Sequence, residues 1–254
     1  MRAAVRAPRD IPAPPFPVKL PWVNVAPLRM DKQLGRPVLI EFWDFCRVSS
    51  LHTLAYTKAW HERYEAGGLR VISVHCPGFE PSRDEDAVRE AVSRLAIEHP
   101  VLIDTEFELW QAYDNPGWPA RYLFGPDGNL YEFHHGEGGY SETEAAIREL
   151  LSDDGDDVGL LRAEDDPEAL LVVPTPDVEG PYSGPYEAGC VWGVFSGSGM
   201  VSAGDVTMEI TAPGAFNLIW HEEHTAGVLE LELGDGVTCH AVCFTPGLAP
   251  DQGR

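Results

Sequence analysis

The chain of 254 residues has an apolar fraction of 44% and seven tryptophans, values typical of a globular protein with one large or two small domains. Its net charge of −23 at pH 7 disfavours phosphate backbones and anionic lipids, so we expect neither nucleic acid nor a membrane as partner. No apolar run approaches the ~18 residues that a membrane-spanning helix needs.

The N-terminal residues 1–15 are rich in proline and arginine and lack the apolar stretch of a signal peptide. We expect them to form a disordered tail, and we expect the protein to be cytoplasmic. In that compartment the five cysteines are expected to be thiols rather than disulfides.

Residues 37–151 alternate apolar runs with helical periods, the pattern of a mostly parallel or mixed sheet covered by helices. The runs PVLIEFW and LRVISVH predict buried strands, and a Gly-Pro-Asp-Gly sequence predicts the turn of a later hairpin. The predicted strands are 37–43, 69–75, 100–104, 120–124 and 129–135.

Four helices are predicted between and after these strands. Ser82 with Glu85, and Ser141 with Glu144, form capping-box pairs that predict where the second and the last helix begin. The first helix lies between the first two strands, and residues 107–113 predict a short third one. The resulting order of strands and helices is the layout of a thioredoxin fold with an inserted segment.

The pattern changes after residue 151. Residues 152–169 are acidic and punctuated by glycine, which predicts a linker. Over 170–248, short β-branched or alternating segments separated by glycine-containing turns predict a small antiparallel sandwich or jelly roll. Residues 249–254 are expected to be a tail. The predicted fold class is therefore α/β and thioredoxin-like over 16–151, followed by a small all-β domain.

Several stretches carry a resemblance to a known family. The strings PFPVKLPWVN, LGRPVLIEFWDF, WHERYEAGGLRVISVH and WPARYLFGPDGNLYEFHHGEGGY resemble the thioredoxin-like part of DipZ-type proteins and of NHL-repeat-containing proteins, from about Phe16 to Leu151. The C-terminal stretch HTAGVLELELGDGVTCHAVCFTPG resembles a shortened form of the jelly roll that follows in DipZ. The resemblance implies a thiol–disulfide oxidoreductase family whose motif after the first strand is W-x-Y-x-C-x-N-C.

The motif is incomplete in this sequence. Trp43 and Phe45 match the family's Trp and Tyr, but the two cysteine slots fall on Arg47 and Ser50. Cys46 occupies the slot just before the nucleophile. The resemblance therefore implies that the two-cysteine motif is lost, because serine cannot resolve a mixed disulfide and arginine cannot attack one.

Two interpretations of the segment remain open. A loop shifted by one residue would pair Cys46 with Ser49 and leave a single reactive thiol, partly accessible and favoured as thiolate by Arg47 and the helix dipole. The alternative is a non-catalytic module that binds a peptide or protein through the degenerate groove and the C-terminal β domain. The expected partners are accordingly protein thiols or disulfides, or an extended peptide segment.

The resemblance adds three residues to the groove. Trp118–Pro119 falls where the family keeps a cis-proline whose backbone pairs with an extended substrate, so we expect a cis bond facing the Cys46–Ser50 loop. Glu41 falls where the family keeps a buried acid that serves the resolving thiol. Without that thiol, a carboxylate satisfied by local hydrogen bonds is an equal alternative for Glu41.

The C-terminal half offers weaker candidates. His221 and His224 are three residues apart on a predicted strand and point to opposite faces, so we expect no metal site there and no cofactor elsewhere. Cys239 and Cys243 are expected on one face of one strand, too far apart to bond. Tyr186, Trp192 and Trp220 offer stacking surfaces for a ligand, although isolated aromatic residues in a small sandwich usually belong to its core.

Overall fold

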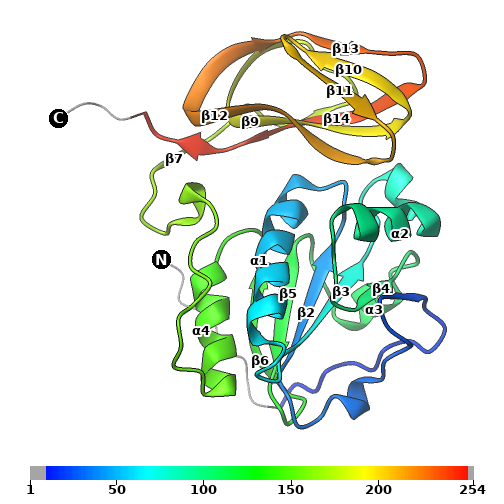
Figure 1. Cartoon of the computed structure of the whole chain (residues 1–254), viewed down its shortest axis with the longest axis vertical. Helices are drawn as coiled ribbons and strands as arrows, with labels where there is room; N and C mark the ends of the chain where they lie inside the picture. Colours follow the sequence, from blue (N-terminus) through cyan, green and yellow to red (C-terminus); the bar gives the residue numbers. More distant parts are fainter. Residues whose placement is uncertain (1–9, 251–254) are drawn as a thin grey trace. The chain divides into compact units, whose positions relative to one another are not determined.

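The computed structural model of the chain describes residues 10–250 and divides it into two compact units, one ending at Leu161 and one beginning at Arg162 (Figure 1). The boundary lies within the segment 152–169 that the sequence predicts as a linker. Each unit has its own core. The two are described separately below.

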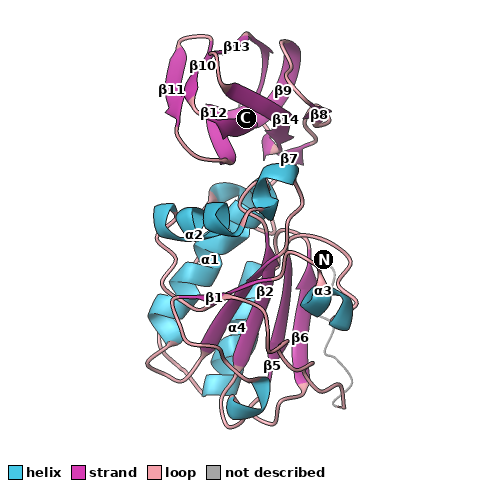
Figure 2. Ribbon diagram, turned by 90° about the vertical axis from the view of Figure 1, so that its right-hand side faces the viewer, coloured by secondary structure: helices cyan, strands magenta, loops and turns pink. Residues whose placement is uncertain are grey.

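The first unit is built on a six-stranded mixed sheet with the order β1-β4-β3-β2-β5-β6. Strands β1, β2, β5 and β6 of this sheet are labelled in Figure 2. Strands β2, β3 and β4 are parallel, whereas β5, β6 and β1 run antiparallel to their neighbours. All six residues of β2 are buried, as expected for a central strand covered on both faces. The strands are β1 (Trp22–Val23), β2 (Val38–Trp43), β3 (Arg70–His75), β4 (Val101–Ile103), β5 (Ala120–Phe124) and β6 (Leu130–His135).

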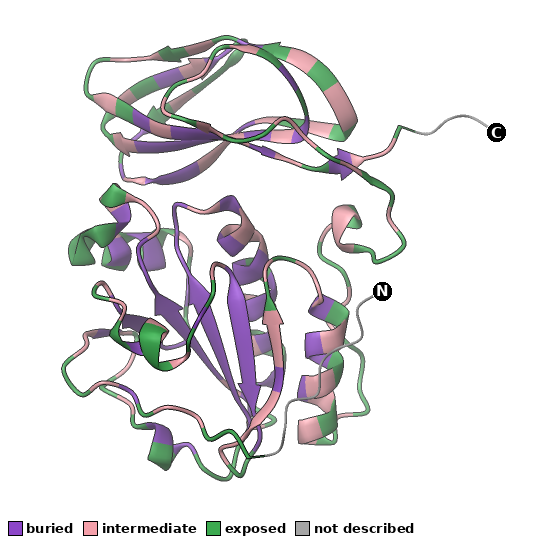
Figure 3. Cartoon of the chain, turned by 180° about the vertical axis from the view of Figure 1, so that it is seen from behind, coloured by how far each residue is buried: buried purple, intermediate pink, exposed green. Residues whose placement is uncertain are grey.

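Helices cover this sheet, whose inner strands β2, β3, β4 and β5 are almost entirely buried (Figure 3). One face packs against α1 and α4, and the other against α3 and the segment that precedes β2. The helices are α1 (Val48–Tyr64), α2 (Glu85–Arg94), α3 (Glu108–Ala112) and α4 (Tyr140–Leu151), with two 3-10 turns, η1 (Met30–Lys32) and η2 (Glu80–Arg83). The predicted α/β fold class is confirmed.

Both predicted capping pairs are wrong. Asp84 caps α2, since its carboxylate accepts a hydrogen bond from the N–H of Ala87 at 2.9 Å. Glu144 does not reach back to the start of α4 but accepts hydrogen bonds from the Tyr64 hydroxyl at 2.5 Å and the Val158 N–H at 2.6 Å. The Glu144 carboxylate is instead engaged in tertiary contacts that the local sequence pattern does not encode.

Up to residue 250, the second unit contains only strands and one 3-10 turn, η3 (Ala163–Asp165), as regular elements. A four-stranded sheet, β12-β9-β14-β8, and a three-stranded sheet, β11-β10-β13, contribute side chains to one core, which confirms the predicted all-β sandwich. The strands are β7 (Leu171–Val172), β8 (Val178–Glu179), β9 (Gly184–Gly197), β10 (Gly199–Ala203), β11 (Val206–Ile210), β12 (Gly214–Leu229), β13 (Leu231–Leu233), β14 (Val237–Thr245) and β15 (Gly247–Leu248).

A bulge in β14 overturns one expectation. The pairing with β9 shifts by one residue between Cys239 and Ala241. Cys239 therefore points into the core, whereas Cys243 is only partly buried, and the two do not share a face.

The predicted tails are shorter than expected. Pro12 bridges Asn129, and the carbonyl of Ile11 accepts a hydrogen bond from the N–H of Leu130 at 2.8 Å, so residues 11–15 are not a disordered tail. At the other end the N–H of Ala249 donates to the carbonyl of Leu170 at 2.7 Å. The expected tail segments 1–9 and 251–254 lie outside the described residues.

Candidate functional site

Two aspartates organise the loops at the carboxyl ends of β2, β3 and β4, the sheet edge where ligands bind in many α/β proteins. Asp44, directly after β2, accepts hydrogen bonds from the N–H groups of Cys46 at 3.0 Å and Gly78 at 2.7 Å. Asp104, directly after β4, accepts them from the N–H groups of Glu108 at 2.7 Å and Trp110 at 2.9 Å. These buried carboxylates fix the loops against one another.

Arg47 is the N-cap residue of α1 and is partly exposed. Its guanidinium carbon lies 4.4 Å from the ring centroid of Trp118 and 5.4 Å from that of Phe79, within the range of a cation–π interaction. A Cβ atom added at Gly78 would lie 2.3 Å from the Arg47 Nε. A side chain at position 78 would displace the guanidinium, so this packing requires glycine there.

Ser50 lies in the first turn of α1 and has no exposed surface. Its hydroxyl accepts a hydrogen bond from the N–H of Asp44 at 3.3 Å. No side-chain cap and no acidic residue is found in this first turn of α1. Ser49, between Arg47 and Ser50, is partly exposed.

Cys46 lies just before α1, as predicted, but the expectation of an accessible sulfur is wrong. Its side chain has no exposed surface. Burial raises the pKa of the Cys46 thiol well above its usual range, and the neighbouring Asp44 carboxylate raises it further, which outweighs the opposite effects of Arg94 and Arg47. The predicted thiolate is therefore absent at neutral pH, because the two charges that favour it are weaker than desolvation.

The Trp118–Pro119 peptide bond is cis, as predicted. The indole N–H of Trp118 donates to the carbonyl of Cys76 at 3.0 Å, which ties the loop before β5 to the end of β3. The Trp118 ring centroid lies 4.4 Å from that of Trp110 and 6.2 Å from that of Phe107. The contacts with Arg47 place this loop beside the start of α1, as expected.

We call Arg47, Phe79, Phe107, Trp110 and Trp118 the Arg47–aromatic cluster. All five are partly exposed. Sequence reasoning missed Phe79, Phe107 and Trp110, although each follows the end of a parallel strand within a few residues, which is a usable signal.

The other residues predicted for the groove lie beneath the surface. Glu41, Trp43 and Ser50 have no exposed surface, and Pro119 is buried. They support the groove and cannot touch a ligand without movement. Only Arg47, Ser49 and Trp118 of the predicted set reach solvent.

Glu41 has a structural environment that matches the local hydrogen-bond alternative. Burial raises the pKa of its carboxyl to about 7, which hydrogen bonding from Ser73 and the charge of Arg121 partly oppose. The Ser73 hydroxyl donates to Glu41 at 2.8 Å and lies 2.7 Å from the Nε2 of His99. Because burial lowers the pKa of His99 to about 3, its ring is neutral at physiological pH.

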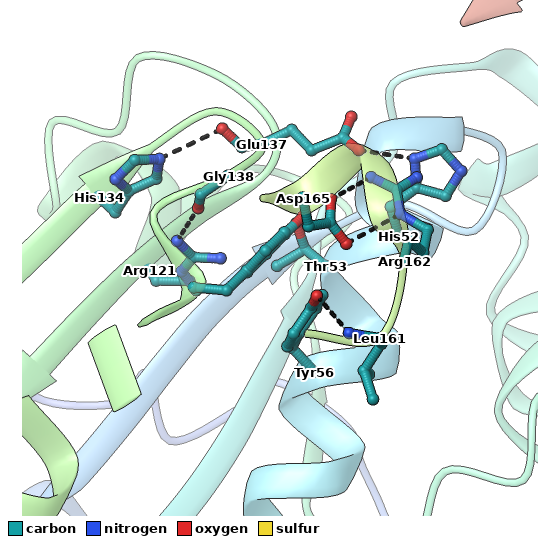
Figure 4. A network of polar contacts seen from close by, with 11 residues as sticks. His52, Thr53, Tyr56, Arg121, His134, Glu137, Gly138, Leu161, Arg162 and Asp165 are labelled. Carbon is teal, nitrogen blue, oxygen red and sulfur yellow. Dashed lines mark hydrogen bonds and ion pairs between the residues drawn. The ribbon is translucent and has the colours of Figure 1, made fainter. Parts of the chain in front are cut away.

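The loop after β6 is held near the start of α1 by polar contacts (Figure 4). Arg121, fully buried and opposite Glu41 in the β2–β5 ladder, donates from its Nη2 to the carbonyl of Gly138. The Nδ1 of His52 on α1 lies 2.7 Å from a carboxylate oxygen of Glu137. These contacts hold the segment between β6 and α4 against α1 and β5.

No protein-family model matches the chain. Protein DipZ of Mycobacterium tuberculosis is 31% identical over 135 residues, which are 52% of this chain and 19% of DipZ. Human NHL repeat-containing protein 2 is 33% identical over 133 residues, 51% of this chain and 18% of that protein. The thiol-disulfide oxidoreductase YkuV of Bacillus subtilis is 25% identical over 142 residues, 56% of this chain and 95% of YkuV.

Solved structures agree. A thioredoxin-like protein in its oxidized form matches with a TM-score of 0.51 and 25% identity over 56% of this chain and 95% of its own. The first unit is a thioredoxin-like domain. The thioredoxin-like superfamily protein SPOA0173 matches with a TM-score of 0.52 and 19% identity over 57% and 99% of the two chains. The chain spans about a fifth of the length of DipZ and of NHL repeat-containing protein 2, so the thioredoxin-like domain is what it shares with them.

The described part of the second unit adds no comparable cluster. Tyr186 is a core residue that stacks on His221 and Phe244, whereas Trp220 is 61% exposed. Within residues 10–250, no three side chains of His, Cys, Asp or Glu group closely enough to hold a metal ion. The described helices include none long and apolar enough to cross a membrane.

Proposed function

We propose that the thioredoxin-like domain binds an extended segment of a partner protein and has lost dithiol–disulfide exchange. One observation carries this proposal: the N-cap of α1 holds Arg47 packed on Trp118 beside cis-Pro119, where the resemblance places the nucleophilic cysteine. The site keeps the frame of an oxidoreductase groove and presents a cation in place of a thiolate.

The groove lacks the two thiols that dithiol–disulfide exchange requires. A dithiol cycle requires an accessible thiolate and a second thiol that can resolve the mixed disulfide. The Ser50 hydroxyl has no sulfur chemistry and is engaged with the Asp44 N–H. The Cys46 thiol is buried and stays protonated at neutral pH, so single-cysteine chemistry is not the function we propose.

Peptide binding has a backbone partner available. Among the described residues, no hydrogen bond uses the backbone N–H or carbonyl of Trp118, while the carbonyl of Pro119 accepts from the N–H of Gly136 at 2.8 Å. An extended segment can pair with the free groups of Trp118 as an added strand does. Side chains of that segment would then lie over the Arg47–aromatic cluster.

The proposal is tested with an unfolded polypeptide as probe. Carbamidomethylated insulin B chain, titrated into isotope-labelled protein, is expected to shift the indole N–H resonance of Trp118 saturably. Trp118→Ala, which lacks this indole and is therefore followed through its backbone N–H resonances, should abolish binding, whereas Trp220→Ala, which removes an exposed indole from the second unit, should leave it unchanged. Catalytic reduction of intact insulin by the wild-type protein would instead refute the loss of redox activity.

A further inference from the structure

We infer that Arg47 receives a carboxylate of the bound segment, so that the domain selects an acidic residue flanked by apolar ones. The inference rests on the proposed function and names the class of segment that the site prefers. It is carried by the Arg47–aromatic cluster.

The guanidinium of Arg47 lacks an acidic partner. Arg29, Arg63 and Arg89 each form an ion pair with a carboxylate of this chain, at 2.6, 3.0 and 3.9 Å respectively. No described residue forms a hydrogen bond or an ion pair with the Arg47 side chain, and its Nε–H is shielded from solvent without an acceptor.

Asp44, three residues before Arg47 in the chain, does not supply the missing carboxylate partner. Asp44 directs its two oxygens to the N–H groups of Cys46 and Gly78, and its Oδ1 lies 3.6 Å from the Nε2 of His75. These contacts fix the carboxylate beneath the loop. Asp44 therefore makes no direct ion pair with Arg47, and the guanidinium has no carboxylate partner among the described residues.

The rings fix the orientation of the guanidinium. Trp118 and Phe79 both contact it through their ring faces, and Gly78 leaves room for its Nε side. A guanidinium held in one plane is preorganised for the two parallel hydrogen bonds that a carboxylate accepts. An ammonium in the same place would offer a charge without this geometry.

The surroundings define the flanking residues of the segment. Phe107 and Trp110 pack against Trp118 and against each other, which extends the aromatic surface beyond Trp118. An apolar side chain next to the acidic one can pack there. The first turn of α1, which contains no acidic residue, adds a favourable field for a negative group.

Two N-acetylated, C-amidated pentapeptides test the inference: Gly-Leu-Glu-Leu-Gly and its Gln counterpart. Titrations follow the indole N–H of Trp118 and the Nε–H of Arg47 by NMR. We expect the Glu peptide to bind about tenfold more tightly, the gain of a charge-assisted pair, and to shift the Arg47 Nε–H resonance. Arg47→Gln should remove the preference, and the exposed Arg36→Gln should preserve it.

The outcomes separate the two proposals. Equal affinities of the wild-type protein for both peptides, or a Glu preference that survives in Arg47→Gln, would overturn the inference and leave peptide binding standing. Binding of neither peptide nor of the insulin B chain would overturn both. The wild-type comparison does not depend on how well any variant folds.

Discussion

Replacing Glu41 by glutamine should change how stability depends on pH. Burial raises the folded-state pKa of Glu41 to about 7 from its ordinary value of 4.5. Because the folded pKa lies above the unfolded one, the contribution to stability is fully present below pH 4.5 and is lost as the pH rises through 7. For one group with these values, linkage gives a loss of about 2.5 kcal/mol between pH 5 and pH 8.

The wild-type curve alone does not reveal this loss. His99, with its pKa lowered to about 3 from 6.5, acts with the opposite sign and destabilises the fold by about 2 kcal/mol at pH 5 relative to pH 8. Glu132, also raised to about 7, adds a second contribution with the sign of Glu41. The quantity to measure is therefore the difference between the wild type and Glu41→Gln at each pH.

Urea unfolding followed by tryptophan fluorescence gives both free energies of unfolding. The wild-type value should fall relative to Glu41→Gln by about 2.5 kcal/mol from pH 5 to pH 8, since the amide has no charge to bury. Any constant offset from altered hydrogen bonding to Ser73 cancels in this comparison. A difference that stays the same at both pH values would show that Glu41 ionises normally in the folded state.

Three further predictions concern the segment around the start of α1. Cys46 should not react with a thiol reagent at neutral pH in the native protein, as peptide mapping of the labelled sites can show; rapid labelling would mean that the loop opens. Gly78→Ala should displace Arg47 from Trp118 and cost about 1–3 kcal/mol in unfolding experiments, the usual range for overpacking; an unchanged Trp118 indole N–H resonance would contradict the close packing. Arg47→Cys with Ser50→Cys, in a Cys46→Ser background, should fold, form an intramolecular disulfide and reduce insulin, and a folded variant whose cysteines never pair would contradict the assignment of the two slots.

Periodicity predicted the elements because their burial is local in sequence. The run Val38–Trp43 is apolar at nearly every position and becomes the central strand, and the glycine turn at 125–128 forms the hairpin. The capping pairs failed for a different reason. Glu144 is bound by Tyr64 and Val158, which are distant in sequence, and no window around the helix start contains them.

The candidate site, too, was only partly predictable from the sequence. The family resemblance was sufficient to place Arg47 and Trp118 beside one another, although they are far apart in sequence. The exposure of Cys46 was not predictable, because the charges near it in sequence favour a thiolate while its burial comes from packing. The bulge at Cys239 was likewise hidden, since one extra residue reverses the face of a strand without altering its composition.

The residues at positions 47 and 50, where the resemblance places the two cysteines, are integrated into the loop, which supports the proposed loss of dithiol exchange. Ser50 satisfies the N–H of Asp44, Asp44 in turn satisfies those of Cys46 and Gly78, and the missing side chain of Gly78 leaves room for Arg47. Returning a cysteine to position 50 therefore replaces a good acceptor by a weak one, and we expect it to lower stability by about 1 kcal/mol even where it restores redox activity.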